Sequence, residues 1–147
     1  MTRVDFYLLE GDAAGGKDLT VCKLAHKAFQ LGHRIYIFTA GNDESQRLDG
    51  LLWTFAAGSF IPHALTVAAD AGMPVIIGHD TPPDACDDVL ITLAPQVPEC
   101  FSRFQRVAEV VGPDEQEKTQ ARERFRFYRE RGYALQAHKI AGASAAL

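Results

Sequence analysis

Short apolar runs alternate along the chain with longer segments of helical periodicity. The apolar runs, rich in β-branched and aromatic residues, predict five strands, at residues 4–9, 34–39, 74–78, 89–94 and 108–111. Helices are predicted at residues 18–31, 43–55 and 114–131, with a short one near 99–104. Strands that alternate with helices predict a mostly parallel sheet with helices on both faces, which is a three-layer α/β fold.

One domain accounts for most of the chain. A chain of 147 residues can bury one core, and the sequence has no internal repeat or linker. We expect an α/β domain over residues 1–135 and a loosely ordered C-terminal tail over 136–147. Apolar runs are too short to span a bilayer, and the first residues do not resemble a signal peptide, so we expect a cytoplasmic protein without membrane contact.

Positive charge is concentrated near the C-terminus. Residues 118–139 include seven basic and two acidic residues, a net charge of +5, whereas the rest of the chain carries −9. This distribution favours one acidic partner at one place over general binding of nucleic acid.

One stripe of the predicted helix at 114–131 combines this charge with an aromatic ring. The stripe consists of Lys118, Arg122, Phe125, Arg126 and Arg129. Beside it lie Ala121 and Tyr128, which we expect to seat the helix on the core. A phenylalanine ring among guanidinium groups suits an acidic peptide with a terminal aromatic residue. An ordinary solvated helix face is the alternative.

A second surface is predicted on the helix at 43–55. Its apolar face is formed by Leu48, Leu51, Leu52 and Phe55. Trp53 lies ~140° from Leu48 around the helix and therefore points away from the core. Because tryptophan is a common anchor of protein interfaces, we interpret Trp53 as a contact residue, with Phe60 and Ile61 extending the patch. The alternative is that the following loop folds back over Trp53.

A phosphate-binding loop is the catalytic alternative. Residues Gly11–Lys17 match the pattern GxxxxGK between a predicted strand and a predicted helix. The next residue is Asp18, however, where the pattern needs a hydroxyl group to hold Mg²⁺, and a carboxylate would repel phosphate. We therefore favour a glycine-rich connection with Asp18 as the helix cap.

Other chemistry-bearing patterns are lacking in the sequence. The five histidines have no metal-ligand spacing, the three cysteines form no CxxC pair, and there is no GxSxG nucleophile elbow. We expect no active site, no metal and no cofactor.

Several segments, in consistent order, resemble the chi subunit family of bacterial DNA polymerase III. They are Phe6–Leu9, Arg47–Asp49 with Leu52–Trp53, Ser59–His63, Asp88–Thr92 and Ala121–Arg129. The resemblance runs from about residue 4 to 133 and is poor over 65–73. Where that family often has Tyr-Lys, this chain has Phe125-Arg126, which keeps the ring and the charge but loses a phenolic hydrogen bond.

The resemblance implies a Rossmann-like fold without nucleotide chemistry and a non-catalytic, accessory role in the clamp-loader assembly during DNA replication. It also implies two partners. The acidic C-terminal tail of single-stranded DNA-binding protein would bind at Lys118, Arg122, Phe125 and Arg126, and the psi subunit at Trp53 and Phe60. Nucleic acid would be contacted only indirectly. Direct binding of single-stranded DNA by the basic helix remains an alternative, although such sites usually offer several stacking aromatic rings.

Overall fold

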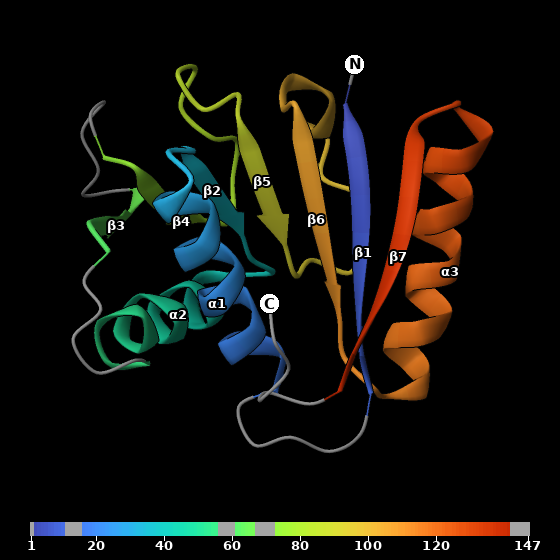
Figure 1. Cartoon of the computed structure of the whole chain (residues 1–147), viewed down its shortest axis with the longest axis horizontal. Coiled ribbons are helices and arrows are strands. Elements are labelled where there is room, and N and C mark those ends of the chain that lie inside the picture. The colour runs from blue at the N-terminus through green and yellow to red at the C-terminus, as the bar shows by residue number, and fades with distance from the viewer. Residues whose placement is uncertain (1, 11–15, 56–60, 67–72, 142–147) are drawn as a thin grey trace.

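The computed structural model describes residues 2–10, 16–55, 61–66 and 73–141, which form a seven-stranded sheet flanked by helices (Figure 1). The strands are β1 (Arg3–Glu10), β2 (Ile35–Phe38), β3 (His63–Leu65), β4 (Val75–Gly78), β5 (Val89–Thr92), β6 (Arg106–Val111) and β7 (Ala134–Ala141). The helices are α1 (Gly16–Gln30), α2 (Asn42–Thr54) and α3 (Glu115–Glu130), with a 3-10 turn η2 (Phe101–Arg103) in place of the helix expected at 99–104.

All neighbouring strands pair in parallel, in the order β3-β4-β2-β5-β6-β1-β7. Helices α1 and α2 cover one face, and α3 covers the other, beside β1 and β7 (Figure 1). The predicted α/β architecture is confirmed, and the sheet is parallel throughout.

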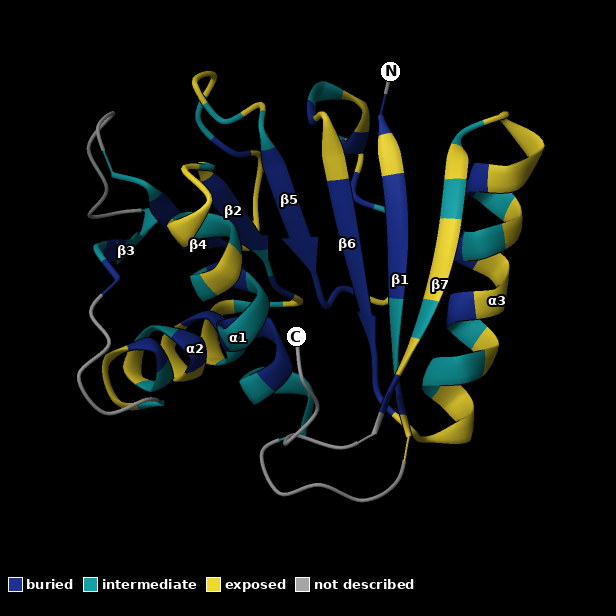
Figure 2. Cartoon of the chain, viewed as in Figure 1, coloured by how far each residue is buried: buried dark blue, intermediate teal, exposed yellow. Residues whose placement is uncertain are grey.

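Two apolar cores lie on opposite faces of the sheet. On β5, Val89 and Ile91 pack toward α1 and α2, whereas Leu90 packs toward α3. Because both faces are covered, the central strands are buried along their length (Figure 2) and read in sequence as continuous apolar runs. This explains why these strands were the easiest to predict.

Two strands were not predicted. Strand β3 has only three residues, in a segment without a predicted strand or helix. Strand β7 pairs with β1 over its whole length, from Ala134 beside Arg3 to Ala141 beside Glu10. The loose tail expected from residue 136 is therefore wrong for 136–141, and residues 142–147 lie outside the described part of the chain.

The N-termini of the first two helices differ from the prediction. Helix α1 begins at Gly16, so Asp18 lies in its first turn instead of capping it. The Asp18 carboxylate accepts a 2.6 Å hydrogen bond from Arg47 Nε and so joins α1 to α2. Helix α2 begins at Asn42, one residue before the predicted range, and Gly41 precedes it.

Helix α3 begins and ends within one residue of the predicted range 114–131. Asp114 caps the helix by accepting a hydrogen bond from Gln116 N. Gly132 follows the helix with φ of +80°, a conformation that favours glycine, and turns the chain into β7. Within the described ranges, none of the helices has the length and apolar content that a membrane span requires.

Candidate functional site

Helix α3 is held on the sheet by a buried polar network. Glu109 on β6 is fully buried and accepts hydrogen bonds of 2.9 Å from Arg124 Nε and from the Tyr128 hydroxyl. Arg124 also donates to the Pro95 carbonyl at 2.8 Å. Burial raises the pKa of Glu109, while the Arg124 guanidinium opposes that rise.

The network changes the charge pattern inferred from the sequence. Arg124 is one of the seven basic residues of segment 118–139, but it is buried and paired, so it adds no charge to the surface. The overlooked signal was Glu109, an acidic residue inside an otherwise apolar strand, which requires a cationic or hydrogen-bonding partner when buried.

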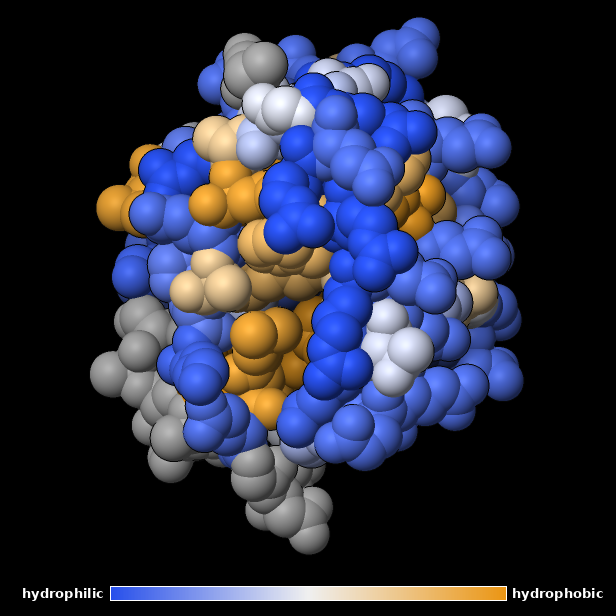
Figure 3. Space-filling view, turned by 90° about the vertical axis from the view of Figure 1, so that its right-hand side faces the viewer, coloured by the Kyte–Doolittle hydropathy of each residue, from blue (hydrophilic) through white to orange (hydrophobic). Residues whose placement is uncertain are grey.

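Phe125 lies at the boundary between the core and solvent. Ala121 and Tyr128 are buried and seat the helix as predicted, whereas Phe125 is half-buried, with its ring centroid 5.3 Å from that of Phe6 on β1. A groove of about 270 Å³ opens here between α3 and the strands β1 and β7. It is lined by Phe6, Leu8, Leu9, Val111, Gly112, Lys118, Ala121, Arg122, Phe125 and Ala137. Figure 3 shows an apolar band on this face, bordered by hydrophilic side chains.

A smaller hollow of about 220 Å³ adjoins the groove. It is lined by Arg122, Phe125, Arg126 and Arg129. The structure thus brings all five residues of the predicted stripe together around two connected hollows that share Phe125 and Arg122. We call this surface the α3 site.

Three guanidinium groups of the α3 site are available to a ligand. Arg122, Arg126 and Arg129 are exposed and make no ion pair or side-chain hydrogen bond with the described residues. Lys118 lies 3.8 Å from the exposed carboxylate of Glu115. The α3 site therefore combines unpaired positive charge with a partly covered ring, which is the chemistry that binds a carboxylate next to an apolar side chain.

The Trp53 side chain, on the second predicted surface, is exposed. It is 52% exposed, and its ring lies 4.5 Å, centroid to centroid, from the ring of buried His63. His63 had no predicted role, yet its two ring nitrogens lie 2.7 Å from the Ile61 carbonyl and 3.0 Å from the Asp49 carbonyl. These two contacts thus hold the His63 ring in place beside Trp53.

Ile61 does not extend the Trp53 surface. Its side chain is 1% exposed and packs in the core against α2, so its expected contact role is wrong. Phe60 lies outside the described residues.

Lys17, the lysine of the glycine-rich pattern, makes an internal contact. Its ammonium group donates to Glu117 Oε1 at 2.6 Å and to the Leu93 carbonyl at 3.3 Å. The same Glu117 oxygen accepts from Gly112 N at 3.3 Å. Lys17 therefore ties α1 to α3, with its charge balanced by a carboxylate; Gly11–Gly15 lie outside the described residues.

Cysteine and metal chemistry have no clear site in the described ranges. The three cysteines are free thiols, and burial raises the pKa of Cys22 to about 12, which keeps it protonated and unreactive. Over the described ranges, no three histidine, cysteine, aspartate or glutamate side chains come together as metal ligands would.

Comparison with known proteins identifies related chains. A family model described as DNA polymerase III chi subunit, HolC, matches residues 1–136. The DNA polymerase III subunit chi of Pseudomonas aeruginosa is 41% identical over 140 residues, covering 95% of this chain and 98% of the relative. The subunit chi of Escherichia coli K12 is 30% identical over 141 residues, covering 92% of this chain and 96% of the relative. The corresponding protein of Haemophilus influenzae is 26% identical over 137 residues.

Proposed function

This chain belongs to the DNA polymerase III chi subunit family of replication accessory subunits, and we propose that it binds the acidic C-terminal tail of single-stranded DNA-binding protein at the α3 site. It acts in the cytoplasm as a non-catalytic adaptor of the clamp-loader assembly. By binding single-stranded DNA-binding protein, which coats the single strand, it raises the local concentration of the polymerase at single-stranded DNA.

The observation that carries this proposal is the set of unpaired guanidinium groups around Phe125. Arg122, Arg126 and Arg129 converge on one hollow with the ring at its edge. An acidic peptide that ends in an aromatic residue can place its ring in the adjoining apolar groove and its carboxylates on these arginines. Each exposed ion pair contributes only about 0–1 kcal/mol, so ring burial must supply much of the affinity.

Peptide titration tests this proposal. The probe is a fluorescein-labelled acidic peptide with a C-terminal phenylalanine, followed by fluorescence anisotropy. We expect the double variant Arg122→Ala/Arg126→Ala to bind at least ~10-fold more weakly, a loss of about 1.4 kcal/mol. Arg131→Ala is the matched control, because Arg131 is equally charged but lies 3.6 Å over the Phe127 ring, outside the α3 site. Equal affinities for wild type and the double variant would reject the proposal.

Direct contact with single-stranded DNA is less well supported. Phe127 packs against Phe101 on one side and carries Arg131 on its ring, and Tyr128 is buried. Among the aromatic residues of α3, only Phe125 is placed to stack on a base, whereas single-strand sites use several.

The psi subunit is the proposed partner of the Trp53 surface. Trp53 projects from α2, and α2 and α3 lie at opposite ends of the molecule (Figure 1). The two partners can therefore bind at the same time. A pull-down with purified psi tests this part: we expect Trp53→Ala to lose psi and keep the acidic peptide.

A further inference from the structure

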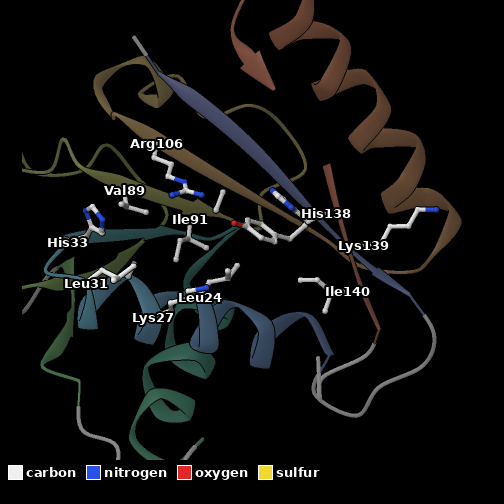
Figure 4. A pocket seen from close by; sticks show the side chains of 13 residues that line it. Leu24, Lys27, Leu31, His33, Val89, Ile91, Arg106, His138, Lys139 and Ile140 are labelled. Atoms are coloured by element: carbon white, nitrogen blue, oxygen red, sulfur yellow. The ribbon is translucent and has the colours of Figure 1, made fainter. Parts of the chain in front are cut away.

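A third hollow lies on the sheet face opposite the α3 site. It has a volume of about 480 Å³ and is formed between α1 and the strands β5, β6, β1 and β7. In Figure 4 the side chains of α1 lie on one side of this hollow and those of the strands on the other, except that Lys139 points away from it. We call it the α1 groove.

The α1 side of the groove is mainly apolar, and the strand side carries both basic and apolar residues. The apolar residues of the α1 side form a single stripe on α1 and its C-terminal end: Leu24, Ala28 and Leu31 follow the spacing i, i+4, i+7. Leu31 is 68% exposed. The strand side carries Arg106 and His138.

The lining of the α1 groove is basic, although carboxylates behind it pair with most of its cations: Asp5 with Arg106 and His138, Asp88 with His33, and Glu10 with Lys139. Thirteen residues line the groove; three are lysine or arginine (Lys27, Arg106 and Lys139), two are histidine, and none is acidic. The chain as a whole has 19 acidic and 15 basic residues, so an acid-free lining is opposite to the overall balance. Lys27 is exposed and makes no ion pair or side-chain hydrogen bond within the described part of the chain.

The Arg106 and His138 side chains of the α1 groove are held in place by Asp5. Asp5 on β1 is fully buried and lies 3.1 Å from Arg106 Nε and 2.9 Å from His138 Nε2. The Tyr7 ring stacks on His138 with centroids 4.9 Å apart. A ligand would therefore meet side chains that are already ordered, which lowers the entropy cost of binding.

Strand register gives the length of the α1 groove. Arg106 pairs with Arg3 of β1 at one end, and Ile140 pairs with Leu9 of β1 at the other. The intervening six steps correspond to about 20 Å at ~3.3 Å per residue. This length fits an extended peptide of about six residues better than a single nucleotide.

We propose that the α1 groove binds an extended, acidic segment of a partner protein in which carboxylates alternate with aliphatic side chains. In an extended peptide, alternate side chains point to opposite sides, so the aliphatic ones face Leu24, Ala28 and Leu31 while the carboxylates face Arg106 and His138 on the strand side. Lys27 adds a positive charge on the α1 side. Nucleic acid fits less well, because Tyr7 and His138 cover each other's rings and the remaining wall is aliphatic.

The probe is a fluorescein-labelled peptide of about eight residues that alternates leucine with aspartate or glutamate, long enough to span the groove. The test variant is Lys27→Glu/Leu31→Ser, since both side chains are exposed and their replacement leaves the cores intact. We expect at least ~10-fold weaker binding of the peptide in fluorescence anisotropy. Arg131→Glu, the same charge change at an exposed residue outside both grooves, should bind as wild type does.

Four outcomes would overturn this proposal. They are no binding to wild type at millimolar peptide, equal binding to wild type and the groove variant, an equal loss of binding in Arg131→Glu, and equally tight binding of an all-glutamate peptide. If labelled oligothymidylate binds wild type more tightly than the peptide and the groove variant loses it, the α1 groove is a nucleic-acid site instead.

Discussion

Arg124 and Glu109 form a buried ion pair, with 2.9 Å between Nε and Oε1, at the interface of α3 and β6. The pair positions the helix that carries the α3 site, although neither residue lines that site. Its removal should therefore affect folding, while removal of the neighbouring exposed arginines should affect binding.

Arg124→Ala should destabilise the fold strongly. It would leave the carboxylate of Glu109 buried without its cation, which costs about 3–5 kcal/mol. Urea denaturation measures the change, and Arg122→Ala is the control, expected to fall within about 0.5 kcal/mol of wild type. Arg124→Met/Glu109→Leu should recover much of the loss; comparable stability of Arg124→Ala and wild type would contradict the assigned role.

Phe125 should control peptide affinity through its ring. Phe125→Ala removes the half-buried ring at the junction of the two hollows and should weaken binding of the acidic peptide ~10-fold or more. Phe125→Tyr keeps the ring and should bind at least as well. Binding to wild type should weaken as salt rises from 50 to 500 mM, roughly the range over which exposed ion pairs become screened; salt-independent binding would argue against the arginines.

Lys17 should matter for stability and not for nucleotide binding. A double-mutant cycle of Lys17→Met and Glu117→Gln should give a coupling of about 1 kcal/mol, because the pair is only partly buried. Millimolar Mg²⁺-ATP should leave the melting temperature unchanged, since a ligand that binds the folded state must raise it. A rise in wild type that disappears in Lys17→Met would revive the phosphate-binding interpretation.

Cys22 should make stability fall at alkaline pH. Its pKa is raised by burial from 9.0 to about 12, so the unfolded chain releases this proton at lower pH than the folded chain does. The free energy of unfolding should therefore decrease between pH 9 and 12, by up to about 1.4 kcal/mol per pH unit from this thiol. Cys22→Ala should show a shallower decrease; parallel curves for the two proteins would exclude Cys22 as the source.

Trp53→Ala should leave the fold intact while removing a partner contact. The side chain is half-exposed, so we expect a change in unfolding free energy below about 1 kcal/mol. Leu48→Ala, on the buried face of the same helix, should cost about 2–5 kcal/mol. Loss of psi binding in Trp53→Ala without a change in melting temperature would support the proposed interface, and retention of psi would contradict it.

The sequence predicted the covered strands and the α3 stripe because burial and helical periodicity leave regular patterns. It did not separate Arg124 from Arg122 and Arg126, since all three belong to one charge run and only the position of Glu109 distinguishes them. Strand β7 was missed because its residues alternate between a half-covered face and solvent, so it lacks the apolar run of a central strand. The α1 groove was not predictable, because its walls come from segments distant in sequence.

Strand β1 serves both grooves. Phe6 lines the α3 site and Tyr7 lines the α1 groove, so successive residues supply opposite faces of the sheet. A one-residue insertion before Phe6 would exchange odd and even positions and turn the aromatic and acidic side chains toward the wrong layers. The alternation of side chains along β1 therefore constrains both surfaces together. The two surfaces can diverge in evolution only by substitutions that leave the spacing of β1 unchanged.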